Sequence, residues 1–230
     1  MTVKDFSMKR LAIFAAVLCA MAGADAVECQ MLLPAEKQKE ILGERWYPQD
    51  SRTRIAQAAV RDGYAAIAKK DYETAIHEFN RAWRFRPDNP SPYWGAAIAF
   101  GMMAEAEKSP AKAMDAIKAS LKLFKMAEKY LPDDIIIREN WQLDYAASSY
   151  AAGEISLVSD KTAAERYFAE AEKIWLPLSE NRELRNRRDR EVYYRSCWHL
   201  AKLYRSWGKN ELYSKYLRKL PAEVRKKLSE

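Results

Sequence analysis

Small and aromatic residues recur at helical spacing along most of the chain. In three segments a small residue is followed four positions later by Phe and three positions after that by Ala, so all three share one helix face. The segments are Ala75-x3-Phe79-x2-Ala82, Ser120-x3-Phe124-x2-Ala127 and Ala164-x3-Phe168-x2-Ala171. Pro87, Pro132 and Pro177 follow them, and we expect each proline to end its helix.

The pattern predicts an entirely helical protein in which each of these segments pairs with a helix before it. The expected helices span 52–69, 72–86, 91–106, 110–131, 135–153, 160–177, 187–207 and 210–220. Asp71 is a candidate N-cap, and Ser109-Pro110 is typical of a cap followed by proline in the first helical turn. Residues 27–51 are expected to form an N-terminal arm with a short helix near 35–43, and residues 221–228 a polar capping helix.

Residues 56–89 carry the clearest repeat. Gly63, Ala75, Phe79, Ala82 and Pro87 resemble the signature of the tetratricopeptide repeat (TPR) family, a helix–turn–helix unit of about 34 residues. The resemblance is degenerate from there to residue 220, because the three repeat phenylalanines lie 45 and 44 residues apart. It implies an all-α, right-handed superhelical array of about four repeats, with a C-terminal capping helix, over residues 52–230.

Arrays of this family line a concave groove with the first helix of each repeat. Carried over by position, the resemblance implies a partner-binding groove formed by Tyr64, Trp94, Ile98, Asp144, Ser148, Trp198 and Lys202. Trp and Tyr suit this role because they bury a large area with little loss of rotamer freedom. The alternative is that these rings fill space between helices. Val60 and Tyr64 stand where chaperone-binding members carry Lys and Asn, so that specificity is not expected here.

The first 26 residues have the pattern of a signal peptide. Lys9 and Arg10 precede an apolar run, Leu11 to Ala22, and Ala24-Asp25-Ala26 matches a cleavage site. We therefore expect an exported, periplasmic protein that begins near Val27. A retained anchor is the alternative, but this run is shorter than the roughly 20 residues that span a bilayer. A lipoprotein is also less favoured, because Leu18 and Glu28 precede the two N-terminal cysteines.

Positive charge is concentrated at the C-terminus. Residues 181–230 contain 15 Lys and Arg against 6 Asp and Glu, a net charge of +9, whereas the whole chain has +7. The densest cluster contains Arg185, Arg187 and Arg188, which we expect to dock an anionic segment of a partner protein. The alternative is a solvated loop with local ion pairs. Export makes nucleic acid an unexpected partner.

Two cysteines, Cys29 and Cys197, remain after removal of the signal peptide. An even number of cysteines in an oxidising compartment suggests a disulfide, which here would tie the arm to the last repeat. The alternative is a buried Cys197 that serves as a small core residue.

The residue types and motifs of this sequence give little support for a catalytic function. The chain has only two histidines, His77 and His199, and lacks HExxH, GxSxG, P-loop and haem-attachment motifs. We expect no enzyme, no metal and no cofactor. The sequence favours a periplasmic scaffold for a protein or peptide partner, an assembly factor or accessory subunit of an envelope or secretion complex, with self-association possible.

Two other functions stay open at this point. One is a binder of a small ligand or an envelope polymer, an accessory of a transporter or glycan system, which a deep pocket lined by Trp94 and Trp141 would favour. The other is an enzyme, which a buried pair of carboxylates in the groove would favour.

Overall fold

The computed structural model describes residues 28–42, 48–187 and 190–229. Every regular element in these ranges is helical, and the chain divides into two compact units, residues 1–86 and 87–230. None of the helices in the described ranges is long and apolar enough to cross a membrane. The signal peptide expected over residues 1–26 lies outside the described residues.

The first unit contains one helical pair and the described part of the arm. Its elements are a 3-10 turn η1 (Gln30–Leu32) and the helices α2 (Ala35–Leu42), α3 (Gln49–Ala68) and α4 (Tyr72–Phe85). The predicted cap is formed, since Asp71 Oδ1 accepts a hydrogen bond from the Thr74 amide at 3.1 Å. Hydrogen bonding from the Thr74 side chain, followed by that from the Thr74 amide, lowers the pKa of Asp71.

The described part of the arm is fastened to α4. The Gln30 amide donates to Asn80 Oδ1 at 2.9 Å, and Asn80 Nδ2 donates to the carbonyl of Glu28 at 2.7 Å. Met31 is fully buried. A buried asparagine on the second helix of the pair therefore fixes the position of a segment about fifty residues earlier in the chain.

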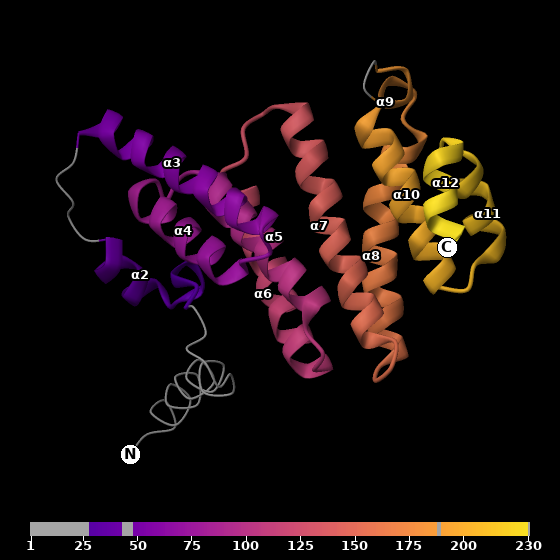
Figure 1. Cartoon of the computed structure of the whole chain (residues 1–230), viewed down its shortest axis with the longest axis horizontal. Coiled ribbons are helices and arrows are strands. Elements are labelled where there is room, and N and C mark those ends of the chain that lie inside the picture. The colour runs from indigo at the N-terminus through magenta and orange to yellow at the C-terminus, as the bar shows by residue number, and fades with distance from the viewer. Residues whose placement is uncertain (1–27, 43–47, 188–189, 230) are drawn as a thin grey trace. The chain divides into compact units, whose positions relative to one another are not determined.

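The second unit contains eight helices. They are α5 (Pro90–Ala106), α6 (Pro110–Glu128), α7 (Ile135–Ser156), α8 (Lys161–Glu180), α9 (Arg182–Asn186), α10 (Glu191–Ser206), α11 (Asn210–Arg218) and α12 (Ala222–Ser229). Neighbours in sequence pack as pairs, α5 with α6, α7 with α8 and α10 with α11, and α7 also packs against α5, α6 and α10 (Figure 1). Helix α7 therefore contacts helices of both other pairs, and α10 also packs against α8.

The predicted repeat face is the buried face. All nine residues of the three small-x3-Phe-x2-Ala segments have no exposed surface. Close approach at these positions needs small side chains, and the phenylalanine ring fills the space beside them. The pattern that predicts the helices therefore also identifies the residues through which they pack.

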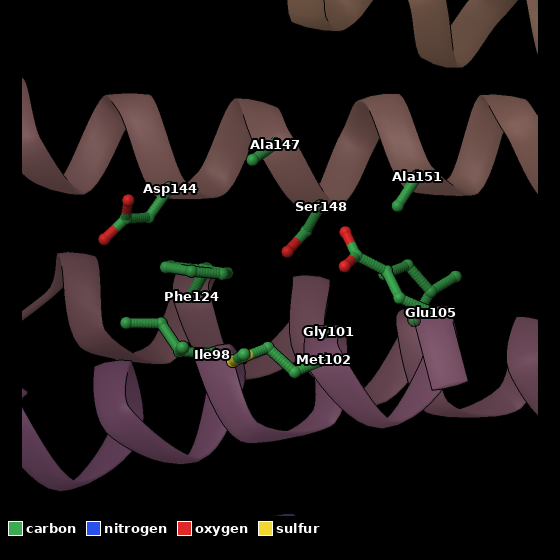
Figure 2. Close-up of a pocket in the computed structure, with 10 residues that line it drawn as sticks. Ile98, Gly101, Met102, Glu105, Phe124, Asp144, Ala147, Ser148 and Ala151 are labelled. Carbon is green, nitrogen blue, oxygen red and sulfur yellow. The ribbon is translucent and has the colours of Figure 1, made fainter. Parts of the chain in front are cut away.

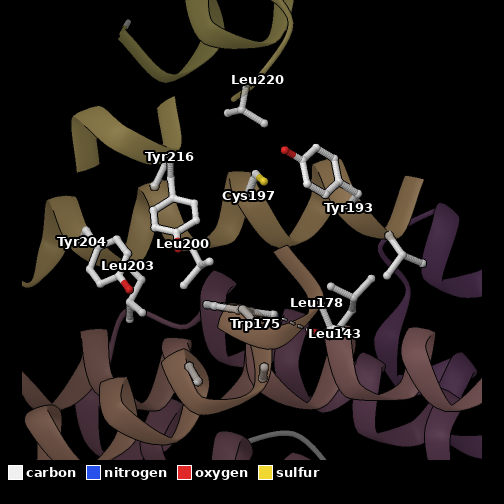
Figure 3. Packing of buried hydrophobic residues seen from close by; sticks show 14 of the residues in the cluster. Leu143, Trp175, Leu178, Tyr193, Cys197, Leu200, Leu203, Tyr204, Tyr216 and Leu220 are labelled. Atoms are coloured by element: carbon white, nitrogen blue, oxygen red, sulfur yellow. Dashed lines mark hydrogen bonds between the residues drawn. The ribbon is translucent and has the colours of Figure 1, made fainter. Parts of the chain in front are cut away.

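The C-terminal core is rich in aromatic side chains. Trp175 of α8 lies beneath α10, and its Nε1 donates to the carbonyl of Leu143 at 3.3 Å. Figure 3 shows Leu200 of α10 between this ring and Tyr216 of α11, with Cys197 on the same helix nearer Tyr193. Helix α12 packs Leu228 onto the same cluster, and its Leu228 carbonyl accepts from Arg205 Nη1 at 2.8 Å.

Two predicted helix boundaries in this region are wrong, and one helix was not predicted. Helix α8 continues through Pro177 to Glu180, where the Asn181 amide donates to the Pro177 carbonyl at 3.0 Å. The short helix α9 was not expected. Asn181 caps it through Oδ1, which accepts from the Glu183 and Leu184 amides. The next helix starts at Glu191 instead of 187, after Arg190 with a left-handed φ of 49°.

Smaller differences concern the N-terminal ends of two helices. The last residues assigned to the arm belong to α3, which begins at Gln49. Helix α6 begins at Pro110 as predicted, but the Ser109 side chain forms no capping hydrogen bond.

Candidate functional site

Asp144 of α7 links three helices of the second unit. Its carboxylate accepts a hydrogen bond from Trp94 Nε1 of α5 at 3.0 Å and another from Arg195 Nη2 of α10 at 2.7 Å. The side chain is only 22% exposed. Burial raises the pKa of Asp144, and the positive charge of Arg195 opposes that shift. The two donors therefore hold a carboxylate in a place where it would otherwise be poorly solvated.

A cavity of 140 Å3 lies between α5, α6 and α7, next to Asp144. Its walls are mostly apolar and include Ile98, Met102 and Ala151, with Glu105, Asp144 and Ser148 as polar groups. Figure 2 shows Ser148 between the two carboxyl groups along the cavity. The site thus offers an apolar slot whose polar groups are two carboxylates and one hydroxyl.

Ser148, which lines this cavity, is paired with a second buried serine, Ser120. Ser120 Oγ of α6 donates to the Ala97 carbonyl at 2.7 Å and lies 2.9 Å from Ser148 Oγ. A Cβ on Gly101 would stand 3.4 Å from Ser148 Oγ, so glycine keeps the cavity open at this point. Ser148 is therefore held by its neighbour on α6.

The structure brings most of the predicted groove residues into one region. Ile98, Asp144 and Ser148 line the cavity, and Trp94 is hydrogen-bonded to its edge. Trp198 and Lys202 lie on α10, which contacts α7. Trp198 packs on the C-terminal core, and Lys202 Nζ lies 5.5 Å from the centre of the Tyr150 ring.

Tyr64, the remaining predicted groove residue, belongs to the first unit. Its side chain on α3 is 39% exposed, and its ring meets Phe79 edge-on at 5.4 Å. Trp141, the other tryptophan considered for a ligand pocket, lies in the core, where it stacks on Tyr145 and donates to the Phe124 carbonyl. Neither Trp94 nor Trp141 is among the described residues that line the cavity.

The sequence reasoning missed three members of this site. Met102 and Glu105 follow Ile98 at spacings of four and seven, so extending the predicted face of α5 by two turns would have found them. Arg195 could not be found in this way. It precedes Trp198 by three residues, and only the packing of α10 on α7 brings it to Asp144.

The arginine cluster expected to bind an anionic partner has divided roles. Arg187 forms a bidentate ion pair with the buried Glu139 of α7. Its Nη1 donates to Oε2 at 2.6 Å and its Nη2 donates to Oε1 at 3.2 Å. Arg185 on α9 is exposed. Arg188 lies outside the described residues. Of the two described arginines, Arg185 is the one whose side chain faces solvent.

Both cysteines of the proposed disulfide are buried, Cys29 in the first unit and Cys197 in the second. Cys197 has no exposed surface, and burial raises its pKa to about 11. This environment matches the alternative of a core cysteine, and the disulfide stays a prediction.

Within the described ranges, no group of three or more His, Cys, Asp and Glu side chains is arranged to hold a metal ion. His199 stacks on Trp175, with ring centres 4.6 Å apart, and burial lowers its pKa to about 3. His77 is exposed beside Glu78. Neither histidine is among the described residues that line the cavity.

The carboxylates at the cavity do not form a buried pair. Asp144 is occupied by two donors, whereas Glu105 is exposed. Ser148 has Ser120 as its partner, and no histidine lies among the described residues around it. The arrangement suits apolar contact and hydrogen bonding better than proton transfer.

Comparison of this chain with family models, with curated proteins and with solved structures found no match. The fold therefore defines a class, an all-helical protein built from neighbouring helical pairs, and the residues of the site carry the argument about function.

Proposed function

We propose that this protein is a non-catalytic, TPR-like helical-repeat scaffold that binds a protein or peptide partner across α5, α7 and α10. The observation that carries the proposal is the cavity beside Asp144. Three residues that the TPR resemblance implied as groove residues, Ile98, Asp144 and Ser148, line it together. The pairing of sequence neighbours and the burial of the repeat face support the repeat architecture.

A single side chain of the partner is the natural occupant of the cavity. Its volume of 140 Å3 is close to that of a roughly 150 Å3 cavity known to accept benzene. Binding sites for drug-sized molecules are larger, about 300–1,000 Å3. The volume therefore favours a peptide anchor over a small ligand or an envelope polymer, which remains the second candidate.

Trp94 and Lys202 would contact the partner beside this anchor. Trp94 is already oriented by its bond to Asp144, so little freedom is lost when a ligand packs on it. Arg185 would meet an acidic segment of the partner, since it is the exposed arginine of the described cluster.

The compartment we propose is the periplasm, with a role as an assembly factor or accessory subunit of an envelope or secretion complex. This part rests on the signal-peptide pattern of residues 1–26.

Filling the cavity tests the proposal. A photo-cross-linker at the half-buried Ala147 of α7, which lines the cavity, would report the partner captured from an envelope extract. Met102→Trp places an indole into the cavity, and Ala106→Trp adds the same ring at an exposed position one turn along α5. We expect the first variant to lose capture at least tenfold and the second to retain it.

Equal capture by both variants would contradict binding at the cavity. A small molecule retained by the wild type through purification, and lost in Met102→Trp, would instead support the ligand-binding candidate.

A further inference from the structure

A row of four lysines runs along the outer face of α6, on the side of that helix opposite its buried face. Lys118, Lys122, Lys125 and Lys129 follow one another at spacings of four, three and four residues. At 3.6 residues per turn this spacing keeps them within one narrow stripe about 16 Å long. All four side chains are exposed.

The positive charge of this row is not balanced locally. The ion pairs among the described residues, taken up to a nitrogen–oxygen distance of 4.0 Å, include none of these four lysines. Asp115 lies one turn before the row and Glu128 on its flank, and neither reaches that distance. Four like charges on one face of a helix repel one another, so the row gains from an external anion.

Apolar side chains accompany the lysines. Leu121 and Met126 lie on opposite flanks of the row, each half-buried, and with the lysine stems they line a shallow depression of about 350 Å3. All residues of this depression belong to α6, except Lys129, which directly follows the last residue of that helix. A cluster of lysines on one helix face, with apolar neighbours beside the lysine stems, is a surface that anionic lipid headgroups attract.

The use of lysine instead of arginine in this row favours binding to an extended anionic surface over binding to a single carboxylate group. Arginine binds carboxylates with a planar fork, as Arg187 does with Glu139 in this protein. The row contains lysine only, and a lysine ammonium acts as a compact point charge that suits a diffuse negative field. An anionic bilayer presents such a field, with apolar depth beneath it for Leu121 and Met126.

From these observations we infer that the outer face of α6 binds anionic lipid headgroups and places the protein on a membrane surface. This function is separate from partner binding at the cavity and does not depend on it. Each lysine that reaches an anionic bilayer strengthens binding by about fivefold at low salt. The attraction falls as salt rises, because screening shortens its range.

The test measures co-sedimentation of the purified protein with vesicles. One set contains phosphatidylcholine and phosphatidylglycerol at a ratio of 70 to 30, and the other contains phosphatidylcholine alone. The row variant carries Lys→Gln at 118, 122, 125 and 129. The matched control carries Lys→Gln at 112, 161, 173 and 226, four exposed lysines of the same unit, so both variants lose the same charge.

We expect the wild type to bind the anionic vesicles at least tenfold more strongly than the neutral ones. The row variant should lose at least tenfold of that binding, and the control should stay within threefold of the wild type. A third variant with Lys→Arg at the four row positions keeps the charge and should bind as the wild type does. All variants have the same N-terminal residues. Any vesicle binding by residues 11–22 is therefore equal in all of them and does not affect the comparison.

Two results would overturn the inference. One is equal vesicle binding by the row variant and the control. The other is a wild type that ignores anionic vesicles but binds poly-glutamate through the same four lysines, which would make the row a site for an acidic protein. Circular dichroism of each variant verifies that the exposed substitutions leave the helices intact.

Discussion

Gly63 of α3 lies directly against the ring of Phe79 of α4. A Cβ built on Gly63 would stand 2.7 Å from Phe79 Cε1, closer than carbon atoms approach without displacement. Gly153 of α7 has the same relationship with Phe168 of α8. In both pairs the missing side chain of a glycine on the first helix makes room for the phenylalanine of the second. This close approach explains why both residues recur at corresponding places.

Substitution of Gly63 should therefore destabilise the first unit. In a helix, Gly→Ala alone stabilises by about 1 kcal/mol. Here the added methyl must displace a fully buried ring, and such overpacking typically costs about 1–3 kcal/mol. We expect Gly63→Ala to lower the free energy of unfolding by up to about 2 kcal/mol, as measured by urea denaturation.

Gly101→Ala is the matched comparison within a helix. A Cβ at Gly101 would meet Ser148 Oγ at 3.4 Å, which is ordinary contact, so the gain in helix propensity should prevail. Equal effects of the two substitutions would show that the Phe79 contact is not the cause.

The ion pair between Glu139 and Arg187 should be needed for stability. Glu139 is 5% exposed and has both oxygens bound by the Arg187 guanidinium. Arg187→Met leaves a buried carboxylate without its partner, which typically costs about 3–5 kcal/mol. Thermal and urea unfolding of the variant would measure this loss.

Two further variants distinguish the loss of the Glu139–Arg187 ion pair from the loss of any one positive charge. Arg185→Met removes an exposed arginine two residues away and should change stability by less than about 0.5 kcal/mol. Adding Glu139→Met to Arg187→Met should recover most of the loss. If the double variant is as unstable as the single one, the ion pair is not the source of the effect.

His199 should make the protein less stable in acid. Burial, with the charges of Arg195 and Lys202, lowers its pKa to about 3, against about 6.5 in an unfolded chain. The folded state therefore prefers neutral imidazole, and this contribution is complete above pH 6.5. It is lost as the pH falls from 6.5 toward 3, because only the unfolded chain gains the proton.

His199→Phe keeps a ring stacked on Trp175 and removes the titration. Relative to its own value at pH 7, the wild type should lose about 2 kcal/mol more than this variant by pH 5. Parallel pH profiles of the two proteins, measured by urea denaturation, would exclude His199 as the cause.

Arg195 should compensate the buried charge of Asp144. Hydrogen bonds to charged groups contribute about 1.5–3 kcal/mol, so Arg195→Met should cost about 2 kcal/mol at pH 7. Without Arg195 the pKa of Asp144 rises further above its usual value. A raised carboxyl pKa means that stability is lost as the pH increases through it, so the cost should be smaller at pH 5 than at pH 7.

Asp144→Asn in the same background removes that charge and keeps an acceptor for Trp94. We expect it to restore most of the stability and to abolish the difference between pH 5 and pH 7. A double variant as unstable as Arg195→Met would show that Arg195 contributes by packing and not by charge.

Much of the secondary structure could be predicted because helices here depend on local spacing. The repeated small-x3-Phe-x2-Ala segments define a buried face within one helix, and Asp71 caps α4 through a residue three positions away. Pro177 misled the prediction. Its side chain is exposed, and the helix continues for another turn, closed by the Asn181 amide.

The candidate site was predictable only in part. The resemblance to TPR repeats implied Ile98, Asp144 and Ser148 as groove positions, because each was carried over from its place in the first helix of a repeat. It could not select Arg195, which reaches Asp144 from a helix 51 residues away. The charge pattern assigned Arg187 to partner binding, because nothing local shows that Glu139 would lie buried beneath it.

The sequence by itself determined that this protein is helical, where most of its helices lie and which faces they bury. These properties follow from periodicity, capping and residue size, which act over one or two helical turns. Only the tertiary structure decided which charges meet. Ion pairs such as Asp144–Arg195 and Glu139–Arg187 join residues about fifty positions apart, and their partners are chosen by the packing of whole helices.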